Sequence, residues 1–203
     1  DCSNCPMAGA PFLVDVRCCT FHPVVPNFLA GRALRRGGVG AAKVRERLQR
    51  SDGLDLRGIG PPAGWKAMYD REQEQGFGRR ADWACPFWVK GPLSCSIWED
   101  RNHTCRSWHC KHVDKAAGQR LWAAQRALGR AVESALAVAA AKRRDTDPID
   151  AHGWELHYLA CAADVESWDV DALEALQTPA IQGLREAVTT ARIGLSAPMP
   201  DVL

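Results

Sequence analysis

The chain has 203 residues, of which 46% are hydrophobic and 25% are charged, and its formal net charge is +2. A chain of this length can bury a core of its own, so it does not need the disulfide bonds that stabilise a short secreted module. Nine cysteines leave at least one free thiol under any pairing, and the longest apolar run, Ala135 to Ala141, is far too short to span a bilayer.

The charge is unevenly distributed. Residues 1–112 contain 17 Lys or Arg and 11 Asp or Glu (net +6), whereas residues 113–203 contain 9 and 13 (net −4). Surplus arginine in the first part would offset the negative charge of thiolates around a metal centre, although it fits an ordinary solvated surface equally well. No basic run exceeds Lys142-Arg143-Arg144 and no aromatic–basic motif accompanies it, which argues against a nucleic-acid partner.

The first part of the chain alternates loops with short helices. Residues 1–27, with four prolines, predict a loop held in shape by ligands. We expect helices over 28–36, capped by Asn27, over 39–50 after the Gly37-Gly38 break, and over 63–75. Short strand-like pieces are predicted at 87–89 and 96–98.

The second part is predicted to be helical. Apolar residues recur at three- and four-residue spacing from an N-cap at Asp114 to about residue 144. Asp147-Pro148 predicts a helix that continues to about residue 163. A short helix begins at Asp169 or Asp171, and a last one begins at Thr178-Pro179 and ends at Gly194.

These elements predict a mainly α protein. Its irregular, cysteine-rich, metal-binding front half (1–112) packs on a C-terminal helical bundle (113–203) in one compact unit.

Eight of the nine cysteines fall into two clusters, with spacings C-x2-C-x12-C-C and C-x9-C-x9-C-x4-C. Four plus four thiols is the ligand count of two four-coordinate metal centres, or of one cluster with spare thiols. The predicted metal- and cofactor-binding residues are Cys2, Cys5, Cys18, Cys19, Cys85, Cys95, Cys105 and Cys110.

The spacing of the cysteines indicates which kind of metal centre to expect. Structural zinc sites usually have two short C-x2-C pairs, and only Cys2/Cys5 forms one here. The adjacent Cys18 and Cys19 cannot easily point both side chains at one small ion, and the nine-residue gaps favour loops around a larger cluster. An iron–sulfur centre is therefore the preferred prediction, with zinc as the alternative.

The late motif Cys85-Pro86-Phe87, Cys95-Ser96-Ile97-Trp98 and Cys105-Arg106, together with the four early cysteines, resembles the YkgJ-type cysteine-cluster family, a zinc- or iron-chelating domain. The twelve-residue gap between Cys5 and Cys18, and Asn102-His103 in place of the proline after Arg101, depart from that family's pattern. The resemblance covers the first 110 residues and implies metal chelation, with iron–sulfur binding in some members.

Other residues near the clusters are further candidates for the site. His22, His103, His109 and His112 could each replace a thiolate at an iron, but any one of them is more often a supporting histidine. His157 and Cys161 share a helix face, for which a buried cysteine beside a partly exposed histidine is expected. Glu99 and Asp100 lack the partner that catalysis would require.

Four tryptophans, Trp83, Trp88, Trp98 and Trp108, are expected to shield the centre partly from water.

The sequence thus predicts a cytoplasmic iron–sulfur protein with one or two [4Fe–4S] centres and a role in electron transfer or sensing, served by a redox or protein partner. Two alternatives stay open. One is a zinc-binding structural or interaction module, and the other is a metalloenzyme with an open iron between the two halves. No membrane association is expected, and the sequence does not specify the oligomeric state.

Overall fold

The computed structural model describes residues 9, 11–108, 115–144, 147–193 and 195, and within these 61% are helical and 6% lie in strands. The mainly α prediction is confirmed. The elements in chain order are β1 (Val25–Pro26), α1 (Asn27–Arg36), α2 (Gly38–Arg50), β2 (Leu54–Asp55), β3 (Gly58–Ile59), α3 (Trp65–Gly76), η2 (Ala81–Trp83), β4 (Trp88–Val89), β5 (Ser94–Cys95), η3 (Trp98–Asp100), α4 (His103–Arg106), α5 (Lys115–Ala141), α6 (Ala151–Ser167), α7 (Val170–Glu174) and α8 (Pro179–Arg192).

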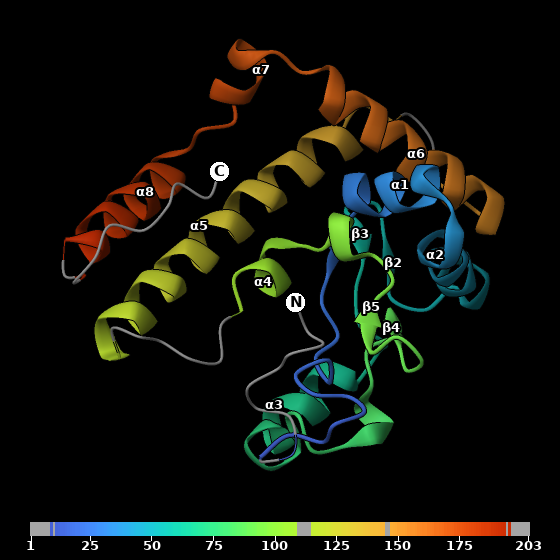
Figure 1. Cartoon of the computed structure of the whole chain (residues 1–203). Helices are drawn as coiled ribbons and strands as arrows, with labels where there is room; N and C mark the ends of the chain where they lie inside the picture. Colours follow the sequence, from blue (N-terminus) through green and yellow to red (C-terminus); the bar gives the residue numbers. More distant parts are fainter. Residues whose placement is uncertain (1–8, 10, 109–114, 145–146, 194, 196–203) are drawn as a thin grey trace.

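Helices α1 and α6 pack closely against each other, although more than a hundred residues separate them (Figure 1). Gly31 permits their close approach, because a Cβ atom there would lie 1.9 Å from the carbonyl oxygen of Tyr158. The Tyr158 hydroxyl is buried at the same crossing and donates to the carbonyl oxygens of Asp55 (2.9 Å) and Gly58 (3.0 Å). The α1–α6 pair is thereby attached to the turn between β2 and β3.

The break between α1 and α2 is where the sequence predicts it. Gly37 and Gly38 have φ values of 80° and 66°, which favour glycine because it lacks a Cβ. Asn27, expected as a helix cap, instead belongs to α1, and Pro26 precedes the helix. The Asn27 amide is fully buried and donates to Leu56 O (3.0 Å) and Ala137 O (2.9 Å), so it joins α1 to two distant segments.

A three-stranded antiparallel sheet in the order β1-β3-β2 was not predicted. Val25 and Leu54 both pair with the central Ile59, and each strand has only two residues. Runs this short carry no alternating pattern that a sequence reading could detect.

In the second part of the chain, α5 extends beyond the core, and α8 packs along α5 (Figure 1). The N-caps of α7 and α8 are confirmed, since Asp169 accepts from Ala172 N (2.9 Å) and Thr178 from Ile181 N (3.3 Å). Helix α6 begins three residues later than predicted because Asp150, not Asp147, accepts the capping N–H, that of Gly153, at 2.7 Å. Asp114 and Gly194 lie outside the described residues.

The main core lies between α1, α2, α6 and the three-stranded sheet, and Ala137 of α5 closes it. Phe87 and Ile97 of the cysteine-rich segment belong to the same core, so residues from both predicted halves share one apolar interior. Across the described ranges, none of the helices combines the length and the apolar character needed to cross a bilayer.

Candidate metal centre

The segment that carries Cys18 and Cys19 is a series of turns fixed to the rest of the molecule by its backbone. Leu13 N donates to Gly78 O at 2.7 Å, and the buried Thr20 hydroxyl accepts from Gly78 N at 2.7 Å. Cys19 O accepts from Cys85 N, also at 2.7 Å. A hydrogen bond between two predicted ligand segments, 66 positions apart, therefore sets their separation.

Cys85 and Cys95 belong to the two arms of the β4–β5 hairpin region. Trp88 pairs with Cys95 in the sheet register, and Trp88 N donates to Cys85 O at 2.9 Å. Ser96 N donates to Phe87 O at 2.8 Å and extends the pairing. The nine-residue gap between these cysteines is thus folded back on itself, which places the two cysteines next to each other.

Cys105 lies in the short helix α4. Asn102 is buried, and its side-chain oxygen caps α4 by accepting from Cys105 N at 3.1 Å. The amide nitrogen of the same side chain donates to Val24 O at 2.8 Å. Asn102, which stands where the YkgJ-type pattern has proline, therefore positions Cys105 against the segment that follows Cys18 and Cys19.

Cys105 interacts with three of the other predicted thiols, and Cys85 interacts with Cys95 as well as with Cys105. Burial, together with the charges of Cys105 and Cys95, raises the pKa of Cys85. Burial raises the pKa of Cys105 to about 12, with contributions from Cys95 and Cys18. The structure therefore brings the sulfurs of Cys18, Cys85, Cys95 and Cys105 from three separate stretches of chain into one neighbourhood, with low polarity around them.

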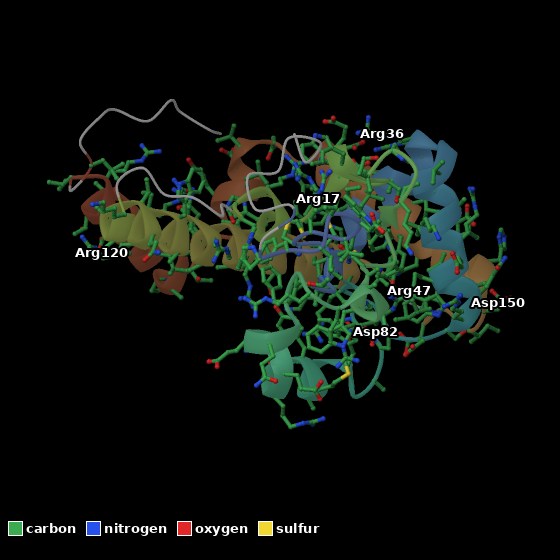
Figure 2. All side chains as sticks on the ribbon, turned by 60° about the horizontal axis from the view of Figure 1, so that its bottom comes forward. Arg17, Arg36, Arg47, Asp82, Arg120 and Asp150 are labelled. Carbon is green, nitrogen blue, oxygen red and sulfur yellow. The ribbon has the colours of Figure 1, made fainter. Side chains whose placement is uncertain are left out.

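Two arginines carry positive charge toward this neighbourhood. Arg47 is buried, donates to Asp52 O (2.7 Å) and Gly60 O (2.8 Å), and interacts with the charge of Cys85 (Figure 2). Arg101 interacts with Cys105, and its guanidinium lies 3.3 Å from the centre of the Trp98 ring. Buried positive charge lowers the cost of forming thiolates nearby.

The four cysteines do not form a compact ligand set by themselves. Among the described residues, no three His, Cys, Asp or Glu side chains are grouped so that they could hold a metal ion. Cys19, Cys85 and Cys105 are free thiols. The remaining predicted ligands and the two nearby histidines lie outside the described residues: Cys2, Cys5, Cys110, His109 and His112.

The tryptophans near the cysteines differ in exposure. Trp83 and Trp88 are buried, and the Trp88 indole donates to Asp15 O at 2.7 Å. Trp108 is 41% exposed, and the Arg126 guanidinium carbon lies 5.0 Å from the centre of its ring. Trp83 and Trp88, which flank Cys85 in sequence, are therefore the tryptophans available to exclude water from the thiols.

The structure describes two of the candidate histidines, His22 and His103. His22 stacks on Trp65 with 4.4 Å between ring centres and bonds Ala84 O through Nε2 (3.2 Å). The Nε2 atom of His103 is buried and has no partner among the described residues. Burial lowers the pKa of both imidazoles.

Three other candidates have structural roles away from the thiols. Asp100 is buried and takes two hydrogen bonds from Arg36 (2.9 and 3.1 Å), so it anchors η3 to α1. Cys161 is fully buried in α6, 3.7 Å from His157 Nε2. The expectation of a partly exposed His157 is wrong, because this side chain is buried and donates to Leu56 O at 2.8 Å.

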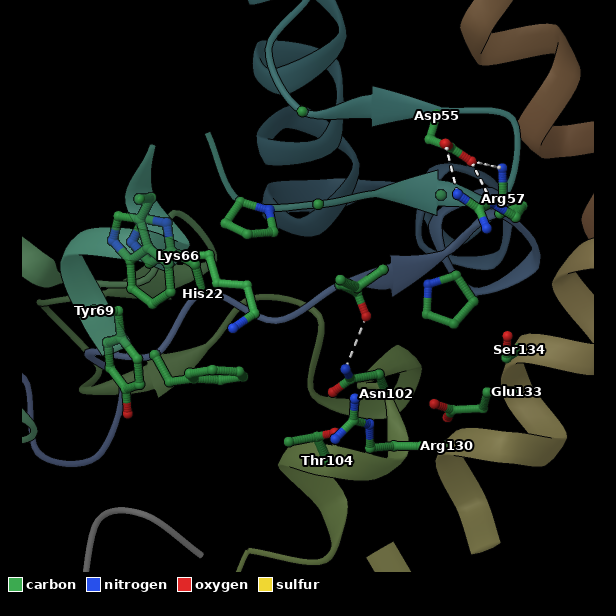
Figure 3. Close-up of a pocket in the computed structure, with 18 of the residues that line it drawn as sticks. His22, Asp55, Arg57, Lys66, Tyr69, Asn102, Thr104, Arg130, Glu133 and Ser134 are labelled. Carbon is green, nitrogen blue, oxygen red and sulfur yellow. Dashed lines mark hydrogen bonds and ion pairs between the residues drawn. The ribbon is translucent and has the colours of Figure 1, made fainter. Parts of the chain in front are cut away.

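A pocket of about 710 Å³ lies beside this region, between α3, α4, α5 and the three-stranded sheet (Figure 3). Thr104 lines it directly before Cys105, and Glu133 of α5 faces it while accepting from His103 N at 2.6 Å. Burial raises the pKa of Glu133 to about 7. This pocket was not predicted from the sequence. The local signal for it is the pair Trp65 and Tyr69, one helical turn apart.

The comparisons identify no relative: no protein-family model, no curated protein and no solved structure matches the chain.

Proposed function

We propose that the chain binds an iron–sulfur cluster, [4Fe–4S], at its clustered cysteines and uses it for electron transfer or for sensing. The observation that carries the proposal is the convergence of predicted ligands from three stretches of chain: Cys105 interacts with Cys18, Cys85 and Cys95, and Cys85 interacts with Cys95. The resemblance of the same cysteine motifs to the YkgJ-type pattern supports it.

The arrangement of these residues favours a cluster over one zinc ion. A zinc ion draws four ligands to a single point, whereas a cubane presents its irons at separate corners, each to a different thiolate. The nine-residue gaps between Cys85, Cys95 and Cys105 fit the second pattern better. The adjacent Cys18 and Cys19 also suit separated irons.

The surroundings fit the charge of such a group. Four thiolates on a cluster leave the complex negative, and Arg47 and Arg101 supply positive charge beside Cys85 and Cys105. Trp83 and Trp88, on either side of Cys85 in the sequence, are buried. When bound, a cluster supplies one-electron transfer at a potential set by charge, hydrogen bonds and solvent access, and these residues are the ones that would tune it.

The test is the iron and acid-labile sulfide content of the full chain purified without oxygen, read with its visible absorption. We expect about four or eight irons per chain. Cys95→Ala and Cys105→Ala should each lower the iron content, whereas Cys161→Ala, which removes a buried thiol in α6, should leave it unchanged. Equal iron in all variants would contradict the ligand assignment. A colourless protein with one or two zinc ions would favour the structural zinc module.

One observation favours a second candidate, an enzyme with an open iron between the two halves. The pocket is lined by both halves and borders Cys105 through Thr104. A cluster with three thiolates and one open iron would be marked by a change in its electron paramagnetic resonance spectrum when a pocket ligand is added. If the spectrum stays unchanged when a ligand is bound, electron transfer or sensing is the favoured function.

A further inference from the structure

The pocket beside α4 has two chemically different walls. On one side, the rings of Phe21, His22, Trp65 and Tyr69 form a continuous aromatic surface. Trp65 stacks on Tyr69 with 4.8 Å between ring centres and on His22 with 4.4 Å, and Phe21 meets Tyr69 edge-on at 5.4 Å. A flat, apolar group is the partner that such a surface accepts best.

The opposite wall comes from α4 and α5 and is polar. In Figure 3 the Arg130 guanidinium lies beside Thr104 and Asn102, across the pocket from Tyr69 and His22. Asn102 already donates to Val24 O and accepts from Cys105 N. Arg130 and the hydroxyls of Thr104 and Ser134 have no hydrogen-bond or ion-pair partner among the described residues, so their donors are available to a ligand.

The charges of the pocket leave Arg130 as its uncompensated cation. Arg57 is paired with Asp55 (2.8 Å) and Lys66 with Asp70, so these four side chains neutralise each other. Glu133, one turn from Arg130, accepts the His103 N–H and forms no ion pair with a described residue. Because burial raises the pKa of Glu133 to about 7, this carboxyl loses its charge as the pH falls below 7, and Arg130 is then the unpaired charge of the pocket. Its planar fork matches a carboxylate.

We propose that this pocket binds a small aromatic monocarboxylate, with the carboxylate on Arg130 and Thr104 and the ring against Trp65. The volume of about 710 Å³ is within the range of roughly 300–1,000 Å³ typical of small-molecule sites. The inference rests on the residues of the pocket alone and does not require that a metal be bound.

The test is calorimetric titration of the full chain with 2-naphthoate. We expect saturable binding at one site, weakened roughly tenfold or more by Arg130→Gln, because a charge-assisted pair is lost. The control is Arg120→Gln, an exposed residue of the same helix that is outside the pocket (Figure 2), and it should leave binding unchanged. Neutral 2-naphthalenemethanol should bind as weakly as naphthoate binds to the Arg130 variant.

Several results would overturn the inference: no saturable binding, equal affinity in Arg130→Gln and the parent chain, or an equal loss in Arg120→Gln. Tighter binding of 2-naphthyl phosphate than of naphthoate would overturn the carboxylate assignment. If Arg130→Gln does not fold by circular dichroism, Arg130→Lys, which keeps the charge but not the fork, should bind with intermediate affinity. Repeating the titration on Cys95→Ala separates the pocket from the metal, because binding should persist when iron is lost.

Discussion

Two buried polar side chains fasten distant segments of this molecule. Asn27 joins the start of α1 to Leu56 and to Ala137 of α5, and Asn102 joins α4 to Val24. Each amide is itself buried, and its bonds to these carbonyls avoid the cost of leaving a buried polar group without a partner. Both therefore act as cross-links between elements, and Asn102 is in addition the N-cap of α4.

His157 gives a prediction at the same scale. Burial lowers its pKa, so the folded state holds the imidazole neutral while the unfolded state takes up a proton below about pH 6.5. Its contribution to stability is therefore present above pH 6.5 and is lost as the pH falls toward the lower folded-state pKa.

We expect His157→Gln, whose amide can still donate to Leu56 O, to flatten the fall in unfolding free energy between pH 7 and pH 5. Urea unfolding at three pH values measures this. His152→Gln, at an exposed site on the same helix, should keep the slope of the parent chain. Parallel slopes in all three proteins would show that the burial of His157 does not contribute.

At the scale of elements, the α1–α6 crossing organises the fold. Its short separation depends on Gly31, and the Tyr158 hydroxyl holds the adjoining β2–β3 turn. The salt bridges from α1 and α2 to α6, Arg32–Glu166 (3.1 Å) and Arg45–Glu155 (2.7 Å), are partly exposed and add little to stability. Apolar packing at the crossing, not charge pairing, therefore keeps the two helices together.

A matched pair of glycine substitutions tests this. Gly31→Ala places a methyl group against the Tyr158 carbonyl and should reduce the unfolding free energy by about 3 kcal/mol. Gly183→Ala lies in α8, where nothing is within 4 Å of the added Cβ, and should increase it by about 0.5–1 kcal/mol through helix propensity. Denaturant unfolding of both variants measures the difference, and a loss of less than 1 kcal/mol in Gly31→Ala would contradict the role given to this crossing.

At the scale of the whole molecule, the predicted ligands lie on stretches of chain that are far apart in the sequence. Cys18 lies in turns before β1, Cys85 and Cys95 flank the β4–β5 hairpin, and Cys105 is in α4. A bound cluster would cross-link all of these, and because the unfolded chain cannot present the same site, binding free energy would add to folding free energy.

We accordingly expect removal of bound iron by a chelator to lower the midpoint of thermal unfolding by more than about 5 °C, the shift that roughly 2 kcal/mol causes in a chain of this size. Differential scanning calorimetry of iron-loaded and iron-free protein measures it. Cys161→Ala should show the same difference between loaded and free protein. Identical midpoints for the two forms of the parent chain would show that the cysteines do not stabilise the fold through a metal.

Local signals were sufficient for several elements. The break at Gly37-Gly38 and the helix starts at Asp169 and Thr178 are confirmed because each depends on hydrogen bonds or φ values within four residues. Asp147-Pro148 misled the prediction of α6, since Asp150 offers the same capping chemistry three residues later. Two adjacent capping candidates cannot be ranked from sequence, because the surrounding fold decides which one meets a free N–H.

By itself, the sequence determined the helical character of the chain, most of its helix ends, and the grouping of eight cysteines whose spacing favours a cluster. Only the tertiary structure decided that the thiols of Cys18, Cys85, Cys95 and Cys105 share one neighbourhood, that Asn27 reaches α5, and that Arg130 and Trp65 line the same pocket. The physical reason is the separation along the chain of the residues that interact. Caps and glycine turns are set by neighbours along the chain, whereas these contacts join residues tens of positions apart and exist only once the apolar core has packed.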